Sequence, residues 1–383
     1  MFKVAAWSCT AGQTDCPAIY TGQRLGAKVF VSQGDDPYMQ QTVSSMGGSR
    51  APLTGTSSVA DFVNSYSITY DGPAIGSLGS SSYDFYKMPD DHEWGGDNWD
   101  HTATQAESQT GISAGGVQAT IDQHFTRGIT AHQQVVSTYC DNPANTDADA
   151  IAEIPAISTL TASSYPVIYF RVGYDVNGNI NNTIPHVEFF FIDCFSYRDP
   201  IAATDDGTVA SPNKTMLGVN QRDWLKAHLL SSTATFKVIF SGKRTYRHTA
   251  GNADTWNQYT KERDNILQYI EDNSITGMLW VAGDQHFPHV IATEAGVGTP
   301  TEGGSFYDHV CMTACPVYAN TNSTDVGNGV IWAHDAYVMG LVEINQTYIE
   351  ASIREVNRGG ALWIGRVVAG DNALSYPPRT VSI

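Results

Sequence analysis

The sequence predicts an α/β protein built on a mixed sheet, or on two stacked sheets, flanked by helices. Short apolar runs of strand length recur along the chain, and in its middle they alternate with segments of helical spacing. Near the C-terminal end, residues 337–356 have the pattern of a hairpin that turns near Asn345 and Gln346. Strands separated by helices favour parallel pairing and hairpins favour antiparallel pairing, so both together predict mixed sheets.

Six apolar runs are rich in β-branched and aromatic residues, as strands are. They are 2–8, 27–33, 166–172, 186–195, 236–242 and 276–282. Residues 220–230 predict a helix because Trp224 and His228, like Leu225 and Leu229, are four positions apart. A second helix is expected from Trp256 onward, with Asp254 as its candidate cap. The Gly/Ser/Thr-rich stretch 47–82 predicts loops.

Composition excludes some classes of protein. The chain has 383 residues, and 21 basic against 39 acidic side chains give a net charge of −18. This charge argues against a nucleic-acid-binding surface, because phosphate backbones attract Lys and Arg. No apolar run approaches the ~20 residues of a membrane span. No internal repeat or linker is visible, so residues 1–383 are expected to form a single domain.

The sequence determines neither the cellular compartment nor the oligomeric state of the protein. Residues 1–10 do not have the pattern of a signal peptide, so either a leader has been removed or the protein stays inside the cell. We expect an extracellular or periplasmic location, with a cytoplasmic one as the alternative. Six cysteines would allow 15 complete disulfide pairings, and their spacing does not choose among them.

Five apolar runs end in side chains that bind metals. These ends carry Cys9, Asp35, the group Asp90-Asp91-His92-Glu93, Asp193, and Asp284 with His286. Carboxylate, imidazole and thiolate ligands together suit hard or borderline cations. Several such ends at one sheet edge would place like charges side by side, which is unfavourable unless cations neutralise them.

Each strand end also has a structural alternative. Residues 34–37 have the composition of a β-turn, and Cys9 and His286 are each compatible with a buried core residue. The stretch DDHEWGGDNWD, residues 90–100, favours a site, because a solvated acidic loop has no need of its two tryptophans and two glycines.

The basic residues and the second predicted helix have alternatives too. Asp193 can pair with Arg198. Arg244 and Arg247 fit solvated surface charges, or partners for some of the 39 acidic side chains, better than substrate contacts. Trp256 and Arg263 fit helix packing and ion pairing.

Six segments in order resemble motifs of the PhoD-like alkaline phosphatases, part of the metallophosphatase superfamily. They are WSCT, GDDPY, PDDHEWGGDNWD, FFFIDCFSYR, MLGVNQRDWL and VAGDQHF, and the resemblance runs from about residue 4 to about residue 345. It implies a catalytic domain with a four-layer αββα sandwich of the calcineurin-like metallophosphatase type. The family's N-terminal immunoglobulin-like domain is expected to be absent.

The resemblance also implies metals and their ligands. Family members bind Fe³⁺ with one or two Ca²⁺. Carried over to this sequence, the iron ligands would be Cys9, Asp35, Tyr38 and Asp284. Candidates for the second metal are Asp35, Asp91 and His286, with Asn98 nearby.

The resemblance assigns the substrate contacts as well. His92 would lie against the phosphate as an acid or an electrostatic clamp, and Asn98 and Arg198 would contact the substrate. Two departures from the family pattern affect these assignments. Phe195 stands where the family has its first Arg, and the spacing leaves open whether Asp97 or Asn98 is the downstream site residue.

The implied function is metal-dependent hydrolysis of phosphate esters, as an alkaline phosphatase or phosphodiesterase. In the expected mechanism a metal-bound hydroxide attacks phosphorus in line. The sequence does not separate monoesters from diesters. One alternative is a phospholipase-type phosphodiesterase, and another is a non-catalytic metal-binding module that retains the fold.

Overall fold

The computed structural model describes most of the chain. The described residues are 1–10, 16–37, 39, 43–45, 48–50, 53, 57–79, 82–93, 118–143, 167–201, 203–244, 255–284, 286, 288–293, 309–313, 330–333, 337–356, 358–370 and 379–380. Among them, no helix is long and apolar enough to cross a membrane.

The first seven-stranded sheet combines parallel and antiparallel strands, in the order β16-β15-β14-β13-β1-β2-β5. Its strands are β1 (Phe2–Trp7), β2 (Val29–Ser32), β5 (Asp84–Lys87), β13 (Val338–Ile344), β14 (Tyr348–Glu355), β15 (Ala361–Val368) and β16 (Arg379–Thr380). β1, β2 and β5 are parallel, and Trp7, Ser32 and Lys87 are in register at their carboxyl ends. β13 and β14 form the expected C-terminal hairpin.

The second seven-stranded sheet has the order β12-β10-β11-β9-β8-β7-β6. Its strands are β6 (Phe170–Tyr174), β7 (Val187–Ile192), β8 (Phe236–Ser241), β9 (Met278–Ala282), β10 (His289–Thr293), β11 (His309–Thr313) and β12 (Val330–Ala333). β7, β8 and β9 are parallel, with Ile192, Ser241 and Ala282 in register at their carboxyl ends. The expected α/β class with mixed sheets is therefore confirmed. A short separate hairpin joins β3 (Val43–Ser45) and β4 (Gly48–Arg50).

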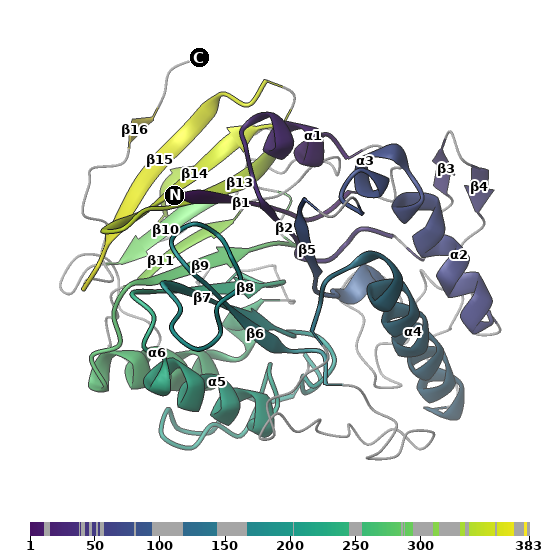
Figure 1. Cartoon of the computed structure of the whole chain (residues 1–383). Helices are drawn as coiled ribbons and strands as arrows, with labels where there is room; N and C mark the ends of the chain where they lie inside the picture. Colours follow the sequence, from purple (N-terminus) through teal and green to yellow (C-terminus); the bar gives the residue numbers. More distant parts are fainter. Residues whose placement is uncertain are drawn as a thin grey trace.

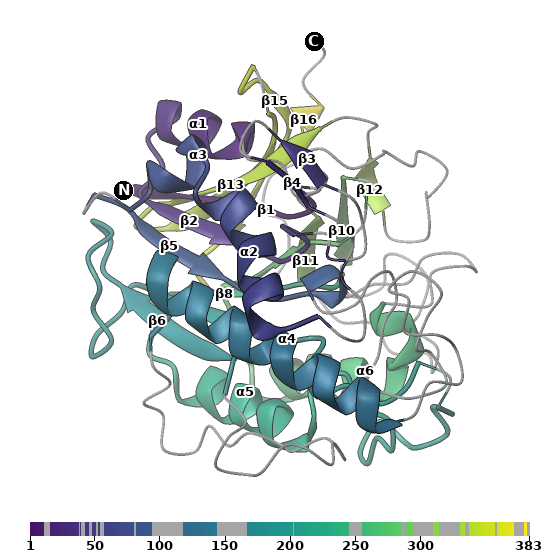
Figure 2. The ribbon, with the colours of Figure 1, turned by 90° about the vertical axis from the view of Figure 1, so that its right-hand side faces the viewer.

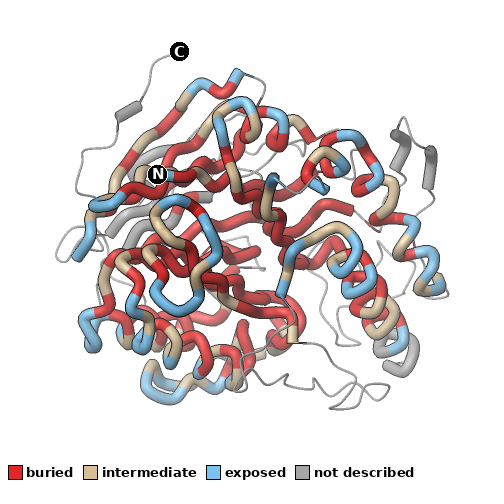
Figure 3. Tube along the Cα trace, in the orientation of Figure 1, coloured by how far each residue is buried: buried red, intermediate tan, exposed pale blue. Residues whose placement is uncertain are grey.

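The two sheets face each other across one apolar core. Val4 and Ala6 of β1 belong to the same buried cluster as Phe189 and Phe191 of β7. The ring of Phe2 lies 6.3 Å from that of Phe189. Among the strands whose burial Figure 3 colours, most residues of both sheets are buried. Burial of this apolar surface provides the main driving force for stacking the sheets.

Helices cover the outer side of each sheet (Figures 1 and 2). The helices are α1 (Pro17–Arg24), α2 (Val59–Tyr70), α3 (Pro73–Gly76), α4 (Gln118–Tyr139), α5 (Val219–Ser231) and α6 (Thr260–Asp272), with 3₁₀ turns at Asp91–Glu93 and Trp256–Gln258. Ala5 and Trp7, which alternate with Val4 and Ala6 along β1, belong to a second cluster with side chains of α1, α2 and α3. The period of two along the strand thus sends neighbouring side chains to opposite faces of the sheet.

The prediction of loops throughout residues 47–82 is wrong, because α2 and α3 lie there. A capping box starts α2, in which Ser58 accepts from the backbone N–H of Asp61 and the Asp61 side chain accepts in return. Phe62, Tyr66 and Tyr70 recur every four residues and are fully buried. Tertiary packing of this aromatic stripe outweighs the low helix propensity of the Ser and Thr residues.

The helix prediction for residues 220–230 is confirmed by α5, and α6 follows the 3₁₀ turn at Trp256. Asp254, the expected cap, lies outside the described residues. Trp256 is buried, and Arg263 pairs with Asp264 at 2.9 Å. The interpretation of these two side chains as packing and ion-pair residues therefore agrees with the structure.

Glu262 on α6 fixes the segment that leads into α5, and we expect it to make stability depend on pH. It is buried and accepts backbone hydrogen bonds from Met216 at 2.6 Å and Leu217 at 3.1 Å. Burial raises the pKa of Glu262 to about 7, although these hydrogen bonds and one from Thr215 act to lower it. The pKa of the folded state thus exceeds the ordinary value of 4.5. The resulting stabilisation is complete below the unfolded-state pKa and is lost as the pH rises through about 7.

Glu262→Gln should remove this dependence. Between pH 4 and pH 8 the wild type should lose about 3 kcal/mol of unfolding free energy relative to the variant. Urea unfolding of both proteins at a series of pH values measures the difference. A difference that stays constant across this range would contradict the assignment.

Candidate metal centre

The carboxyl ends of parallel strands from both sheets meet at the candidate site. In the first sheet the chain leaves β1 toward Cys9, β2 toward Asp35 and β5 toward the segment 90–93. In the second sheet it leaves β8 toward Lys243 and β9 toward Asp284 and His286. Within each sheet the parallel strands end in register. The residues that come directly after these strands therefore lie together at the carboxyl edge of their sheet.

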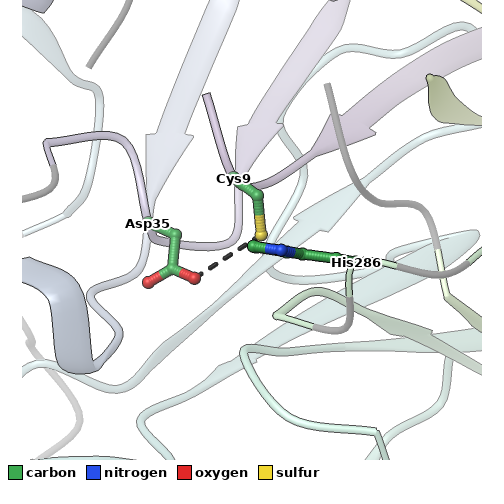
Figure 4. A group of neighbouring side chains, drawn as sticks. All are labelled: Cys9, Asp35 and His286. Atoms are coloured by element: carbon green, nitrogen blue, oxygen red, sulfur yellow. Dashed lines mark hydrogen bonds between the residues drawn. The ribbon is translucent and has the colours of Figure 1, made fainter. Parts of the chain in front are cut away.

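Cys9, Asp35 and His286 form the first of three groups of metal-binding side chains. Figure 4 shows the Cys9 and Asp35 side chains pointing toward each other, with the His286 ring beside the Cys9 sulfur. Their ligand atoms all lie within 4.8 Å of one another. Cys9 Sγ is 3.5 Å from Asp35 Oδ2 and 3.6 Å from the Asp284 carbonyl oxygen. A thiolate, an imidazole and a carboxylate suit a transition metal.

The other two groups are mainly carboxylates. One joins Asp35, Asp91 and His92, and the other joins Asp35, Asp90, Asp91 and Asp284, again within 4.8 Å. Oxygen ligands of this kind suit a hard cation such as Ca²⁺. Asp35 belongs to all three groups, so its carboxylate lies where two metal positions would share a ligand.

The electrostatics of Asp35 fit a bound cation. Its Oδ1 is buried and has no hydrogen-bond partner. Burial, followed by the charges of Cys9, Asp90 and Asp91, raises the pKa of Asp35 well above its usual range. A buried oxygen without a donor is costly, and a cation at this position would satisfy it and offset the repulsion. The residues present therefore fit a metal centre.

Three candidate ligands have a strained backbone. Cys9, Asp35 and Asp284 have φ angles of 59°, 60° and 65°, in the left-handed region that disfavours side chains. Each such residue costs on the order of 1 kcal/mol, and strain of this kind concentrates at functional sites. The turns after β1, β2 and β9 thus aim their side chains at a common point.

Glycines next to these ligands let the loops approach closely. A Cβ on Gly34 would lie 2.5 Å from the Cβ of Asp90, and one on Gly283 would lie 2.9 Å from Ser8 Oγ. Both distances are shorter than real contacts allow. Gly34 and Gly283 therefore permit the turn after β2 to touch the segment after β5, and the turn after β9 to touch that after β1.

A buried ion-pair network supports the turn that carries Asp35. Lys87 Nζ lies 3.0 Å from Asp36 Oδ2 and 2.8 Å from Glu93 Oε1, and all three side chains are fully buried. Glu93 also accepts the backbone N–H groups of Asp35 at 3.0 Å, Asp36 at 3.1 Å and Asp90 at 2.9 Å. Although burial acts to lower it, the charges of Asp36 and Glu93 raise the pKa of Lys87 above its usual range.

Asp36 and Glu93 support the site from outside the three ligand groups. Asp36 is buried, pairs with Lys87 and accepts a hydrogen bond from Tyr70 at 2.8 Å. Glu93 holds backbone amides and belongs to none of the three groups. Both carboxylates support the turn that positions the candidate ligands.

Comparisons with known proteins identify a related family for part of the chain. The sequence model of the PhoD-like phosphatase family matches residues 183–330. Residues 183–330 are thus similar to the PhoD-like phosphatases. Alkaline phosphatase D of Bacillus subtilis (strain 168) is 31% identical over 110 residues, which are 26% of this chain and 19% of that protein. The matched part is thus about a fifth of the relative's length.

The fold of this chain resembles that of solved phosphatase structures. The structure of PhoD has a TM-score of 0.66 and 16% identity, and the match covers 100% of this chain and 71% of that one. At this identity the likeness concerns the fold. A purple acid phosphatase from yellow lupin (Lupinus luteus) seeds has a TM-score of 0.46 and 10% identity, covering 94% of this chain and 52% of that one.

The PhoD-like segment 183–330 contains only part of the site. Asp284 and His286 lie within it, whereas Cys9, Asp35 and Asp91 precede it. The structure groups these residues differently from the sequence expectation, because His286 lies with Cys9 and the Asp284 carboxylate lies with Asp90 and Asp91. Which metal each ligand holds stays a prediction. Tyr38, Asp97 and Asn98 lie outside the described residues.

Two arginines of the PhoD-like segment, Arg198 and Arg244, are buried. Arg198 is fully buried, with its guanidinium 4.8 Å from the centre of the Phe195 ring. Its charge acts on buried Asp193, which accepts the backbone N–H groups of residues 195 and 196. The role of Arg198 as a substrate contact stays a prediction. The interpretation of Arg244 as a solvated surface charge is wrong, because Arg244 is 2% exposed. Arg247 lies outside the described residues.

Sequence reasoning missed Lys243, and it assigned Asp90 no separate role. Lys243 Nζ lies 2.8 Å from Asp90 Oδ1 and 2.7 Å from Asp284 Oδ1. A signal for Lys243 existed in the strand ends: β2, β8 and β9 are followed by Gly34-Asp35, Gly242-Lys243 and Gly283-Asp284. Because β8 and β9 are parallel neighbours, their Gly-Lys and Gly-Asp ends had to lie together.

The described cysteine side chains are thiols. Cys9, Cys16, Cys140 and Cys194 take part in no disulfide. Cys315 and the side chain of Cys311 lie outside the described part of the structure. Cys9 is thus available as a thiolate ligand.

Proposed function

We propose that this protein hydrolyses phosphate esters with metals held at the strand ends. The observation that carries the proposal is the set of three overlapping ligand groups centred on Asp35, with its buried and unpartnered Oδ1. The match of residues 183–330 to the PhoD-like phosphatases supports phosphate esters as the substrate class. Bound metals would supply a Lewis acid that acidifies water and offsets charge on the phosphate.

We assign the two metal positions by ligand chemistry. Cys9, Asp35 and His286 would hold iron, because thiolate and imidazole suit a borderline or trivalent ion. Asp35, Asp90, Asp91 and Asp284 would hold calcium. The resemblance adds Tyr38 to the iron position and Asn98 to the substrate contacts.

His92 is our candidate for proton transfer. It is 7% exposed, and a ring nitrogen belongs to the group with Asp35 and Asp91. The Asp91 carboxylate accepts the His92 backbone N–H at 3.1 Å, and the His92 carbonyl accepts from Met39 at 3.1 Å. These bonds hold the backbone so that the imidazole reaches the ligand groups. A proton on the His92 imidazole can be transferred to the leaving oxygen of an ester.

We also propose that residues 1–383 act as one catalytic domain, because strands of both sheets share one core and both sheets supply candidate ligands. An extracellular or periplasmic location stays a prediction, which cell fractionation would test.

Chelation tests the proposal. We expect a strong chelator to abolish hydrolysis of an aryl phosphate monoester and an aryl phosphodiester, and added Ca²⁺ to restore it while iron is retained. The faster of the two substrates would define the ester class. Full activity in excess chelator would contradict metal dependence, and bound metal without turnover of either ester would favour a non-catalytic module.

A further inference from the structure

Lys243 places an ammonium group among the carboxylates of the candidate calcium position. Its Nζ lies 2.7 Å from Asp284 Oδ1, 2.8 Å from Asp90 Oδ1 and 3.5 Å from Asp91 Oδ1. Its side chain has no exposed surface. These three aspartates are, with Asp35, the members of the four-carboxylate group. The ammonium therefore contacts the same side chains that a second metal would use.

The backbone holds Lys243 in this place. The Ser241 hydroxyl donates to the Lys243 carbonyl at 2.6 Å and accepts from the Lys243 N–H at 3.3 Å. The Ser241 carbonyl accepts from Gly283 at 3.1 Å and from the Gln33 side chain at 3.1 Å. The turn after β8 is thus tied to the turns after β9 and β2. Lys243 reaches the carboxylates from an anchored position.

The contacts also imply competition. A divalent cation bound by Asp90 and Asp284 would approach the oxygens that Lys243 contacts at hydrogen-bond distance, and like charges repel strongly in a buried site. A metal would therefore have to displace the ammonium or share carboxylates with it. Either event weakens binding relative to the same site without Lys243.

We propose that Lys243 is an internal counter-ion that stabilises the carboxylate group before the second metal binds and lowers its affinity for a divalent cation. The inference rests on the proposed function, since it takes the carboxylate group to be the second metal position. Lys243 acts on the metal through the aspartates, so it is a positioning residue. Removal of the Lys243 charge should therefore lower the stability of the metal-free protein and raise its affinity for the metal.

Lys243→Met tests this, because methionine has a similar length and no charge. The metal-free variant should melt roughly 5 °C below the wild type, since its buried carboxylates lose their cation. Its dissociation constant for Ca²⁺, titrated alone by calorimetry into metal-free protein, should fall by about tenfold or more. Calcium is the appropriate probe because it prefers oxygen ligands to thiolate and imidazole.

Lys237→Met is the matched control. Lys237 is 7% exposed, lies near the start of β8 and donates to the carbonyl oxygens of Ala234 at 2.8 Å and Thr276 at 3.4 Å. It belongs to none of the three ligand groups, so its replacement should leave calcium affinity unchanged. If Lys243→Met does not fold, Lys243→Gln removes the charge while keeping a polar end.

Three outcomes would overturn the proposal. Unchanged or weaker calcium binding in the Lys243 variants, with a wild type that binds metal and hydrolyses esters, would overturn the counter-ion role alone. Unchanged calcium binding together with lost inhibition by inorganic phosphate would make Lys243 a substrate contact instead. A wild type that neither binds calcium nor hydrolyses esters would overturn the proposed function as well.

Discussion

Asp35→Asn is expected to lose bound metal and to lower kcat/KM for an aryl phosphate by roughly 10³-fold. Asp35 is the single residue present in all three ligand groups, so one substitution affects both metal positions. In the metal-free protein the change should leave the melting temperature unchanged or raise it. The reason is that the pKa of this carboxyl is raised by burial and then by the charges around it, so that a neutral amide relieves repulsion.

Asp36→Asn is the matched control, because it alters the neighbouring carboxylate. Asp36 pairs with Lys87 and belongs to no ligand group. Its replacement should cost about 1–3 kcal/mol of unfolding free energy and leave metal content near that of the wild type. Metal analysis and denaturant unfolding of both variants separate the two roles. Retention of metal in Asp35→Asn would count against the site.

Lys87→Met is expected to be the most destabilising single change in the support of the site, at about 3–5 kcal/mol. The substitution leaves the Asp36 and Glu93 carboxylates buried without the ammonium that contacts both. Glu93 also holds the backbone amides of Asp35 and Asp36, so the turn should lose order together with the ion pair. Denaturant unfolding measures the loss.

Lys3→Met gives the comparison for Lys87→Met. Lys3 pairs with Glu343 at 3.2 Å, and its side chain is 28% exposed. Solvent screens this pair, so its removal should cost less than about 1 kcal/mol. Similar losses of unfolding free energy in the two variants would show that the buried ion-pair network does not stabilise the turn.

The strands were predictable from sequence because buried strands consist mainly of apolar and aromatic residues. β7 is a run of buried and mainly apolar and aromatic residues, and the β13–β14 hairpin has an almost fully buried, apolar first strand before its polar turn. α2 was not predictable in this way, since its Ser and Thr residues resemble a loop and its helical stripe is made of aromatics that pack on the sheet. Tertiary packing decided that segment.

The site was predictable as a set of strand ends, and less so in its detail. Cys9, Asp35 and Asp91 follow parallel strands of the first sheet and Asp284 follows a strand of the second, so parallel pairing and the stacking of the two sheets together bring them close. The sequence next to a charged side chain does not show which distant residues form ion pairs with it. The segment around Lys243 therefore did not show that this side chain turns inward to carboxylates that follow two other strands.

Stepwise reloading of metal-free protein tests the central claim most directly. Bound metal per chain, the visible absorption spectrum and hydrolysis of an aryl phosphate would be measured in the same samples. Metal-dependent hydrolysis at Asp35 predicts that turnover rises with bound metal, that iron gives a charge-transfer band, and that Cys9→Ser shifts this band. Full turnover in protein that carries no metal would contradict the claim.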